Sequence, residues 1–486
     1  MISPLKKKTI LGIIWAGFGS IGSQAIHYIV LLILAWLLEP EDFGLLGIAM
    51  MFILFTQAIT ELGFGAAIIQ HPEIKEPGLS TAFWSNLLIG TILGLLTYKG
   101  AAVVTEFIGD VDAAPLLEVL AVIFPITAVS VVPSALLEKQ LEFRRLSTRD
   151  FASEVAFGVI GISLALLGYG VWSLVGAAIA QRTFNAIMLF WIVPWRPKFQ
   201  FSYDSLKSLI HFGGYAMIAA LLNKGVANID YFVIGRWLGT EALGYYTLAF
   251  QLSVVPERRV IAVIQRVVFP AFSVVQDNLK RLTSGFKESL RYLYMVLSPL
   301  TIFGIVLAPW FIKTLYGDKW QASILPMQIL VIAGFFYGFE VAEMVYYALG
   351  KPQLRIWIIG VRIGLFALFA AIFGVSNGIV GIAVSLSLSV AIAASVSFFI
   401  IVGLTQSSWK SILQPIWNAL KSALVAGLPV IVVLFVFRDE IADIQPGLIL
   451  ISTGLILVTL YILTVLTIYP QFYGQLRAGF FQVIKK

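Results

Sequence analysis

Apolar stretches follow one another along almost the whole chain, from Leu11 to Ile468. Each is about 20 residues long, which is enough for a helix to cross the ~30 Å hydrocarbon core of a bilayer. The 486 residues are 59% hydrophobic and only 12% charged, with a mean hydropathy of +0.93, a composition that no soluble fold requires. The chain is therefore predicted to be an all-α polytopic membrane protein.

We expect about fourteen transmembrane helices from the hydropathy pattern. They lie near residues 11–37, 42–68, 80–105, 115–137, 150–168, 171–193, 208–236, 242–270, 288–316, 322–349, 354–374, 378–404, 418–437 and 447–468. With both termini in the cytoplasm, the cytoplasmic segments hold roughly 22 Lys and Arg and the opposite side roughly 5. The net charge of +7 follows from this asymmetry, so it indicates no nucleic-acid partner.

The first span follows the basic segment MISPLKKKTI and is too long for a secretory signal, so we expect a retained helix with a cytoplasmic anchor. The absence of Cys excludes disulfides and thiolate metal sites, and three scattered His residues make a metal site unexpected. There is no P-loop, and the predicted loops leave no room for a catalytic domain. We therefore expect no enzyme activity, no metal and no cofactor.

An internal repeat relates WLLEPEDFGLLGIA (36–49) to RWLGTEALGYYTLA (236–249). With an offset of 200, Leu38, Glu41, Gly44 and Ala49 match Leu238, Glu241, Gly244 and Ala249. A looser correspondence relates 168–176 to 376–384. Six spans separate the two copies, so the halves share one orientation and are predicted to form a parallel pseudo-twofold repeat.

This repeat predicts two six-helix lobes followed by two C-terminal helices. The first lobe covers 1–196, a cytoplasmic linker 197–207, and the second lobe 208–405. Residues 406–486 then contain an interfacial segment, the last two helices and a cytoplasmic tail. Two similar bundles of this kind favour a transporter that exposes a central site to each side in turn.

Several stretches resemble bacterial polysaccharide flippases of the multidrug/oligosaccharidyl-lipid/polysaccharide superfamily, especially the colanic-acid-type exporters. They are LLEPEDFGLLGIAMMF (37–52), ELGFGAAIIQ (61–70), LLGYGVWSLV (166–175), NIDYFVIGRWLGTEALGYYTLAFQLSVVP (228–256) and RVVFPAFSVVQ (266–276). The resemblance covers roughly residues 10–400 and implies fourteen helices in two lobes around a central cavity. It also implies movement of undecaprenyl-pyrophosphate-linked oligosaccharide from the inner to the outer leaflet of the bacterial cytoplasmic membrane.

Charged residues inside the predicted spans are candidate functional residues, because an ion in hydrocarbon costs about 2.5–3.5 kcal/mol unless it faces protein or water. Arg258 and Arg259 lie ~24–26 Å along their helix and point about 100° apart. We expect Glu257, or an acid of another helix, to neutralise one of them. The other is the strongest candidate for binding a pyrophosphate, because guanidinium groups match phosphate oxygens bidentately. Arg266 is interpreted as an anchor that snorkels to the headgroups.

Other polar residues of the spans are weaker candidates for substrate binding, and packing explains each of them equally well. They are Lys224, Asn223, Asn228, Gln24, His27 and Arg182. Gln24 and His27 share one helix face, so they are suited either to sugar hydroxyls or to a packed interface.

A second set is assigned to ion coupling, gating or structural pairing. Asp230 is acidic and lies toward the outer side, so it is a candidate for binding H⁺ or Na⁺ or for pairing with a neighbouring helix. Gln57 and Glu61 share a face near the cytoplasmic end and are assigned to gating. Glu343 is expected to pair with Arg355 or Arg362, and Glu154 with Arg182.

The sequence therefore predicts a lipid-linked oligosaccharide flippase that contacts membrane lipids and works by alternating access, with H⁺ or Na⁺ as a coupling ion. Contacts with a polysaccharide polymerase or glycosyltransferases are also expected. One alternative is a multidrug cation exporter of the same superfamily, although buried arginines would repel cationic drugs. The other is a membrane glycan polymerase or ligase, which would need a larger external loop.

Overall fold

A computed structural model describes residues 22–60, 64–70, 74–140, 142–207, 209–210, 228–374, 376–437 and 444–468. All regular structure in these residues is helical, and they contain no β-strand. The prediction of an all-α protein is therefore confirmed for the described part of the chain.

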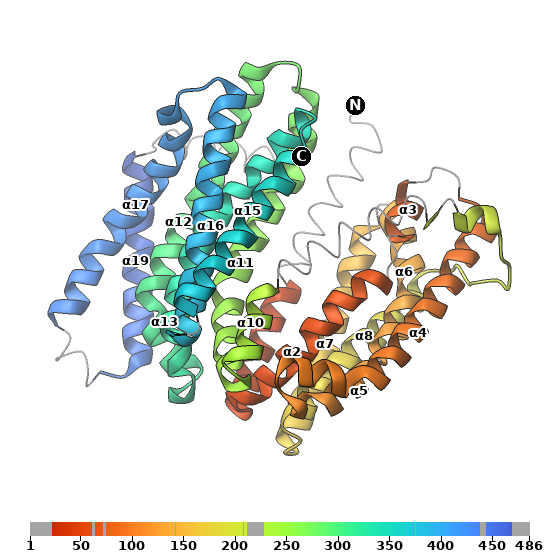
Figure 1. The fold of residues 1–486 in the computed structure, drawn as a ribbon. Helices are drawn as coiled ribbons and strands as arrows, with labels where there is room; N and C mark the ends of the chain where they lie inside the picture. The colour runs from red at the N-terminus through yellow and green to blue at the C-terminus, as the bar shows by residue number, and fades with distance from the viewer. Residues whose placement is uncertain are drawn as a thin grey trace. The chain divides into compact units, whose positions relative to one another are not determined.

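The chain divides into two compact units, Met1–Thr247 and Leu248–Lys486. The first contains a helix at Gly22–Leu37, then α2 (Pro40–Thr60), α3 (Phe64–Gln70), α4 (Glu76–Ile108), η1 (Val111–Ala113), α5 (Ala114–Leu120), α6 (Ile123–Lys139), α7 (Phe143–Leu166), α8 (Val171–Ile192) and α10 (Ile229–Trp237). Helix α11 (Thr240–Val274) begins in the first unit and continues into the second (Figure 1). The predicted lobe boundary at residues 197–207 stays a prediction.

The second unit is built from long helices with short irregular turns between them. They are α12 (Leu279–Leu315), η2 (Asp318–Ser323), α13 (Ile324–Tyr337), η3 (Gly338–Ala342), α14 (Glu343–Ala348), α15 (Gln353–Phe369), the π-helical turn η4 (Ala370–Gly374), α16 (Gly378–Thr405), α17 (Trp409–Val436) and α19 (Pro446–Ile468). Its apolar core is formed where α12 packs on α17 and α19, around Ile302, Ala423 and Leu457.

Helix ends follow local sequence rules. Helix α4 has a Pro in its first turn, where the missing N–H costs nothing, and stops at Gly109, whose φ of +107° suits glycine. The side chain of Asn278 caps α12 by accepting a hydrogen bond from the backbone N–H of Arg281 at 3.1 Å. Small residues then allow close helix packing, as where Gly161 of α7 faces Ala177 of α8.

The repeated glycines Gly44 and Gly244 lie at one reciprocal contact within the first unit. A Cβ on Gly44 would lie 2.6 Å from the carbonyl carbon of Thr240, and a Cβ on Gly244 would lie 2.6 Å from that of Pro40. Pro40 and Thr240 are themselves 200 positions apart, like the two glycines. The first turns of α2 and α11 therefore meet in a locally two-fold arrangement that only glycine allows at these positions.

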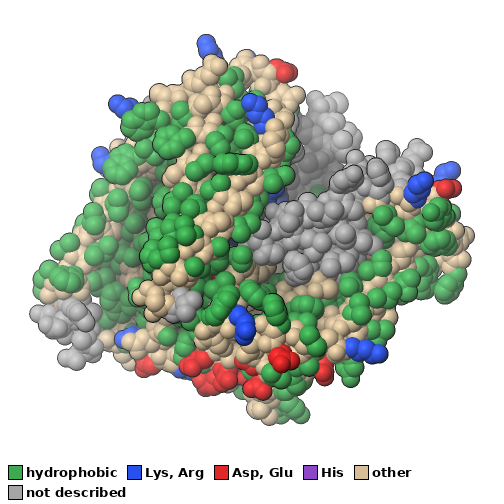
Figure 2. All heavy atoms as spheres, in the orientation of Figure 1, with side chains coloured by type: hydrophobic (Ala, Val, Ile, Leu, Met, Phe, Trp, Pro, Cys, Tyr) green, Lys and Arg blue, Asp and Glu red, His purple; other side chains and the backbone are tan. Residues whose placement is uncertain are grey.

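The structure is that of a multi-pass membrane protein. Among the described residues, nine helices are long and apolar enough to cross a membrane. They are Glu76–Ile108, Val111–Lys139, Val171–Ile192, Leu279–Leu315, Asp318–Ala348, Gln353–Gly374, Gly378–Thr405, Trp409–Val436 and Pro446–Thr467. Hydrophobic side chains are spread over the face drawn in Figure 2. On α15, for example, Ile356 and Trp357 are 72% and 67% exposed, as expected for side chains that face lipid.

Several predicted spans differ in detail from the observed helices; the span at 115–137, for example, consists of two helices, α5 and α6. The span at 322–349 is broken, because the 3-10 turn η3 separates α13 from α14. The span at 418–437 begins earlier, because the segment expected to lie at the interface is the first half of α17. Fourteen crossings in total stay a prediction.

Candidate functional site

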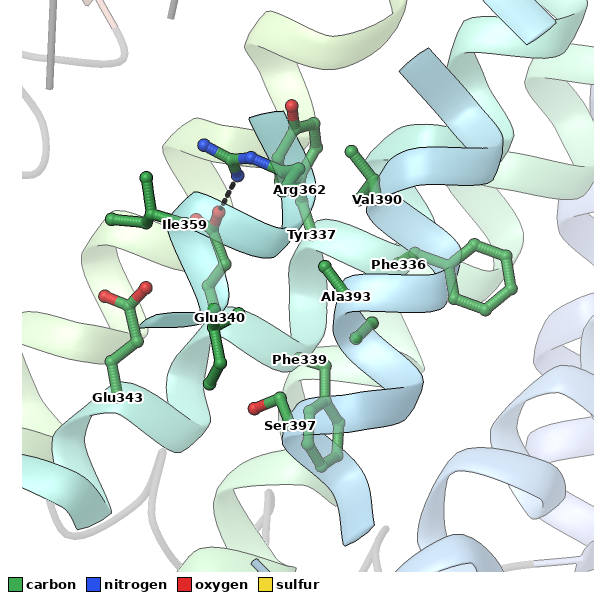
Figure 3. A pocket seen from close by; sticks show the side chains of 12 residues that line it. Phe336, Tyr337, Phe339, Glu340, Glu343, Ile359, Arg362, Val390, Ala393 and Ser397 are labelled. Carbon is green, nitrogen blue, oxygen red and sulfur yellow. Dashed lines mark hydrogen bonds and ion pairs between the residues drawn. The ribbon is translucent and has the colours of Figure 1, made fainter. Parts of the chain in front are cut away.

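The second unit contains a pocket that carries charged residues into an otherwise apolar bundle. Its walls come from α13, η3 and α14 on one side and from α15 and α16 on the others. Glu340, Glu343 and Arg362 line it together with apolar and aromatic side chains (Figure 3). The pocket is therefore a candidate binding site.

Two ion pairs join η3 and α14 to α15 at this pocket. Arg362 Nη1 donates to Glu340 Oε1 at 2.8 Å, drawn as the dashed line in Figure 3. Arg355 Nε lies 3.0 Å from Glu343 Oε2, and its Nη1 donates to the hydroxyl of Tyr347 at 2.5 Å. Arg362 therefore pairs with Glu340, while Glu343 pairs with Arg355, one of its two expected partners.

Tyr337, at the end of α13, lies between two guanidinium groups. The Arg258 guanidinium carbon is 4.1 Å from the centroid of its ring, and that of Arg362 is 5.4 Å away. Cation–π contacts of this kind orient a guanidinium without neutralising its charge. Tyr337 is almost completely buried, so it fixes both arginines from inside the bundle.

The three arginines of α11 have different surroundings. Arg258 is half-buried against Tyr337, whereas Arg259 and Arg266 are exposed. The neighbouring Gln265 donates to the backbone carbonyl of Glu340 at 3.2 Å, which ties α11 to the turn η3. Of the three, Arg258 is therefore the one that α11 presents to the pocket cluster.

We define the arginine cluster as Arg258, Arg355, Arg362, Glu340 and Glu343. The three guanidinium groups all interact electrostatically with Glu343. The cluster thus gathers three guanidinium groups and two carboxylates within one part of the second unit. Such a site can exchange a carboxylate for a phosphate oxygen, since both anions offer the same bidentate geometry to a guanidinium.

In the first unit, His27 and Glu154 lie in one polar contact rather than apart. His27 Nδ1 is 2.6 Å from Glu154 Oε1, and Gln181 Nε2 donates to Glu154 Oε2 at 2.6 Å. Gln181 of α8, the neighbour of the expected partner Arg182, is thus one partner of Glu154. Gln24 lies one turn before His27, and its side chain is half-buried.

Asp230 has a buried partner of its own. The hydroxyl of Tyr246 donates to Asp230 Oδ2 at 2.7 Å, and Asp230 and Tyr246 are 2% and 0% exposed. Asn228 stands at the N-terminal end of α10 without capping it through its side chain. These contacts favour a structural role for Asp230.

Four candidates cannot be placed. Asn223, Lys224 and Glu61 lie outside the described residues, as does the side chain of Gln57. Within the described ranges, no group of three or more His, Cys, Asp and Glu gathers to hold a metal ion.

Two features of the site were missed at the sequence level. In the sequence, Tyr337 is one of several aromatic residues in an apolar helix, so nothing indicates that it contacts arginines. Glu257 was expected as a partner of Arg258 or Arg259, but its side chain is buried against Gly334 and Thr301. The signal for the second was the small residue Gly334 on α13, which can be read as a contact of Glu257 only once α11 and α13 are known to be neighbours.

Comparisons with known proteins agree with this architecture. Residues 33–325 match the family model described as polysaccharide biosynthesis protein. The chain is 31% identical over 284 residues to the teichuronic acid biosynthesis protein TuaB of Bacillus subtilis, and the match spans 58% of either chain. It is 26% identical over 336 residues to the lipopolysaccharide biosynthesis protein WzxC of Escherichia coli, spanning 68% of either chain.

The fold is similar to that of the lipid II flippase MurJ in its inward closed conformation. The TM-score is 0.76, and the likeness covers 95% of this chain and 100% of that one. Sequence identity is 15%, so this likeness concerns the fold alone.

Proposed function

Because the chain belongs to the polysaccharide biosynthesis protein family of the MOP superfamily, we propose that it is a flippase for lipid-linked oligosaccharide. Two relatives of the chain are named as a succinoglycan biosynthesis transport protein and a putative O-antigen transporter, in line with the prediction of a transporter without enzyme activity. The substrate class we infer is an undecaprenyl-pyrophosphate-linked oligosaccharide, moved from the inner to the outer leaflet of the bacterial cytoplasmic membrane.

The observation that supports this proposal most is the arginine cluster. An apolar bundle has no structural need for three guanidinium groups, since hydrophobic packing of similar volume is at least as stable as a buried ion pair. An anionic headgroup gives these groups a function. We assign Arg258 as the first contact with the pyrophosphate, and Arg355 and Arg362 as contacts that become available when their carboxylates are displaced.

The proposed mechanism is alternating access between two lobes of six helices related by a parallel pseudo-twofold axis. The headgroup enters a central hydrated cavity from the cytoplasm while the polyprenyl tail remains in lipid. Fourteen crossings, a linker at residues 197–207 and two cytoplasmic termini complete the proposed topology. Movement is driven by H⁺ or Na⁺ or by consumption of the product outside, and a polymerase or glycosyltransferase is the expected partner.

Several residues have smaller proposed roles. Gln24, His27 and Arg182 remain candidates for sugar contacts in the first lobe, and Arg259 remains one at the cytoplasmic entrance. The same applies to Asn223, Lys224 and Asn228, whereas Gln57 and Glu61 are proposed to gate or to couple ions. For Asp230, ion coupling is the alternative to the structural role that its contact with Tyr246 favours.

The proposal is tested by deleting the gene and following the surface polysaccharide of the cell. Loss of polysaccharide, with lipid-linked repeat units accumulating in the inner leaflet, is the expected result. Restoration by the wild-type chain and by Arg266→Ala, but not by Arg258→Ala, would assign the function to the arginine cluster.

A multidrug exporter would give a different outcome in the same strains. Deletion would then leave the polysaccharide intact and raise the accumulation of cationic dyes. That result would overturn the flippase, and the positive charge of the arginine cluster argues against it because it repels cations.

A further inference from the structure

Glu257 is a carboxylic acid buried in a contact between three helices of the second unit. It is 2% exposed and projects from α11 toward α12 and α13. On α13 its Oε2 occupies the place that a Cβ would take at Gly334. On α12 its Oε1 lies 3.2 Å from the hydroxyl oxygen of Thr301.

The number of protons available for hydrogen bonding indicates whether this contact suits the ionised or the protonated carboxyl group. Thr301 has one hydroxyl proton, and its oxygen lies 2.8 Å from the carbonyl oxygen of Leu297, closer than it lies to Glu257. If that proton goes to the carbonyl, the 3.2 Å contact requires a proton on Glu257, because two acceptors cannot bond to one another. The protonated acid then donates to Thr301.

The other groups around Glu257 supply no counter-charge. On α12 the titratable neighbour is the buried phenol of Tyr294, and on α11 the nearest polar side chain one turn away is Ser253. Arg258 is adjacent in sequence but turns toward Tyr337. Within the described residues, Oε2 has no hydrogen-bond partner and no basic side chain pairs with Glu257.

A buried carboxylate without a counter-charge is costly, so a proton is the ligand that this site fits. A sodium ion fits less well, because hard cations take several oxygen ligands. Here one carboxyl oxygen is packed against the backbone of Gly334, and the carbonyl of Leu297 is already bonded to Thr301.

The geometry points to Glu257 as a proton-binding site whose occupancy is linked to the arginine cluster through the packing of α11 on α13. Glu257 and Arg258 are adjacent on α11, and their contacts Gly334 and Tyr337 are one turn apart on α13. Release of the proton to water leaves a carboxylate in the contact with Gly334. Separation of the two helices hydrates this charge and at the same time withdraws Arg258 from Tyr337. Only the coupling of this proton to transport of the lipid-linked oligosaccharide rests on the proposed function.

Protonation of Glu257 is tested on the purified protein by infrared titration, which requires no substrate. The wild-type chain is expected to show the carbonyl absorption of a protonated, buried carboxylic acid at pH 7. Glu257→Gln should lose this absorption, and Glu288→Gln, which removes an exposed carboxyl group of α12, should retain it. An identical spectrum for wild type and Glu257→Gln would overturn the assignment. Loss of the absorption on adding Na⁺ at constant pH would overturn it in favour of a sodium site.

Two further measurements keep the test decisive. Gly334→Ala fills the place of Oε2, so it should shift the same absorption even if Glu257→Gln folds poorly. In proteoliposomes, a pH gradient should change the rate of lipid-linked oligosaccharide flipping at least severalfold for wild type and Glu288→Gln, and not for Glu257→Gln. Wild-type vesicles that do not flip at all would contradict the proposed function while leaving the infrared result standing.

Discussion

The reciprocal glycine contact between α2 and α11 leads to a quantitative prediction. In Gly44→Ala the new Cβ would lie 2.6 Å from the carbonyl carbon of Thr240, whereas carbon atoms in contact are about 3.5–4.0 Å apart. The two helix ends must therefore separate by at least about 1 Å, because the carbonyl oxygen of Thr240 lies closer still and backbone cannot rotate away as a side chain can. A gap of that size forfeits about a quarter to a half of each dispersion contact, so we expect about 3 kcal/mol, the upper part of the range for overpacking.

The assay is thermal unfolding in detergent, followed by tryptophan fluorescence. For a unit of this size, 1 kcal/mol corresponds to about 2–4 °C, so Gly44→Ala should lower the midpoint by about 6–12 °C. Gly244→Ala should have the same effect, since its Cβ would meet Pro40 in the same way. The control is Gly100→Ala in α4, where a Cβ meets nothing within 4 Å.

The double variant distinguishes a shared contact from two independent defects. Once one alanine has separated α2 from α11, the second finds space, so the combined loss should be well below the sum of the single losses. Full additivity of Gly44→Ala and Gly244→Ala would refute the reciprocal contact. So would a midpoint for either single variant equal to that of Gly100→Ala.

Two further predictions concern buried polar contacts. Gly334→Ala should destabilise by about 1–3 kcal/mol because its methyl group overlaps Glu257 Oε2, and adding Glu257→Ala should recover most of the loss; simple additivity would contradict the contact. Glu154→Ala should cost about 1–3 kcal/mol because it removes the acceptor of Gln181 and the partner of His27. An unchanged unfolding midpoint of Glu154→Ala would contradict that arrangement.

Hydropathy predicted the long helices well where polar turns interrupt the apolar runs. The predicted span at 378–404 matches the observed α16 to within one residue. Its start is marked in the sequence, because Gly378 adopts a φ of +58° after the polar Ser376 and Asn377. The break at η3 has no such signal, since Gly338–Ala342 is as apolar as its flanks except for Glu340. Its tightened turn depends on tertiary contacts, among them the hydrogen bond from Gln265 to the Glu340 carbonyl.

The candidate site, like the helices, could be predicted from the sequence only in part. The cost of charge in hydrocarbon is a property of each residue, so Arg258, Arg362 and Glu343 were identified from the sequence. Which acid pairs with which base depends on the rotation of η3 relative to α15, and this placed Glu340 opposite Arg362. Tyr337 could not be predicted as a partner of Arg258, because a cation–π contact needs no sequence pattern beyond an aromatic residue on a neighbouring helix.

Flipping of undecaprenyl-pyrophosphate-linked oligosaccharide by purified protein in proteoliposomes tests the central claim most directly. Loss of a charge-assisted contact costs about 1.5–3 kcal/mol, so Arg258→Ala should slow flipping by ~10- to 150-fold. The exposed Arg266→Ala on the same helix should flip at the wild-type rate. Equal rates for wild type, Arg258→Ala and Arg266→Ala would contradict the arginine cluster as the headgroup site.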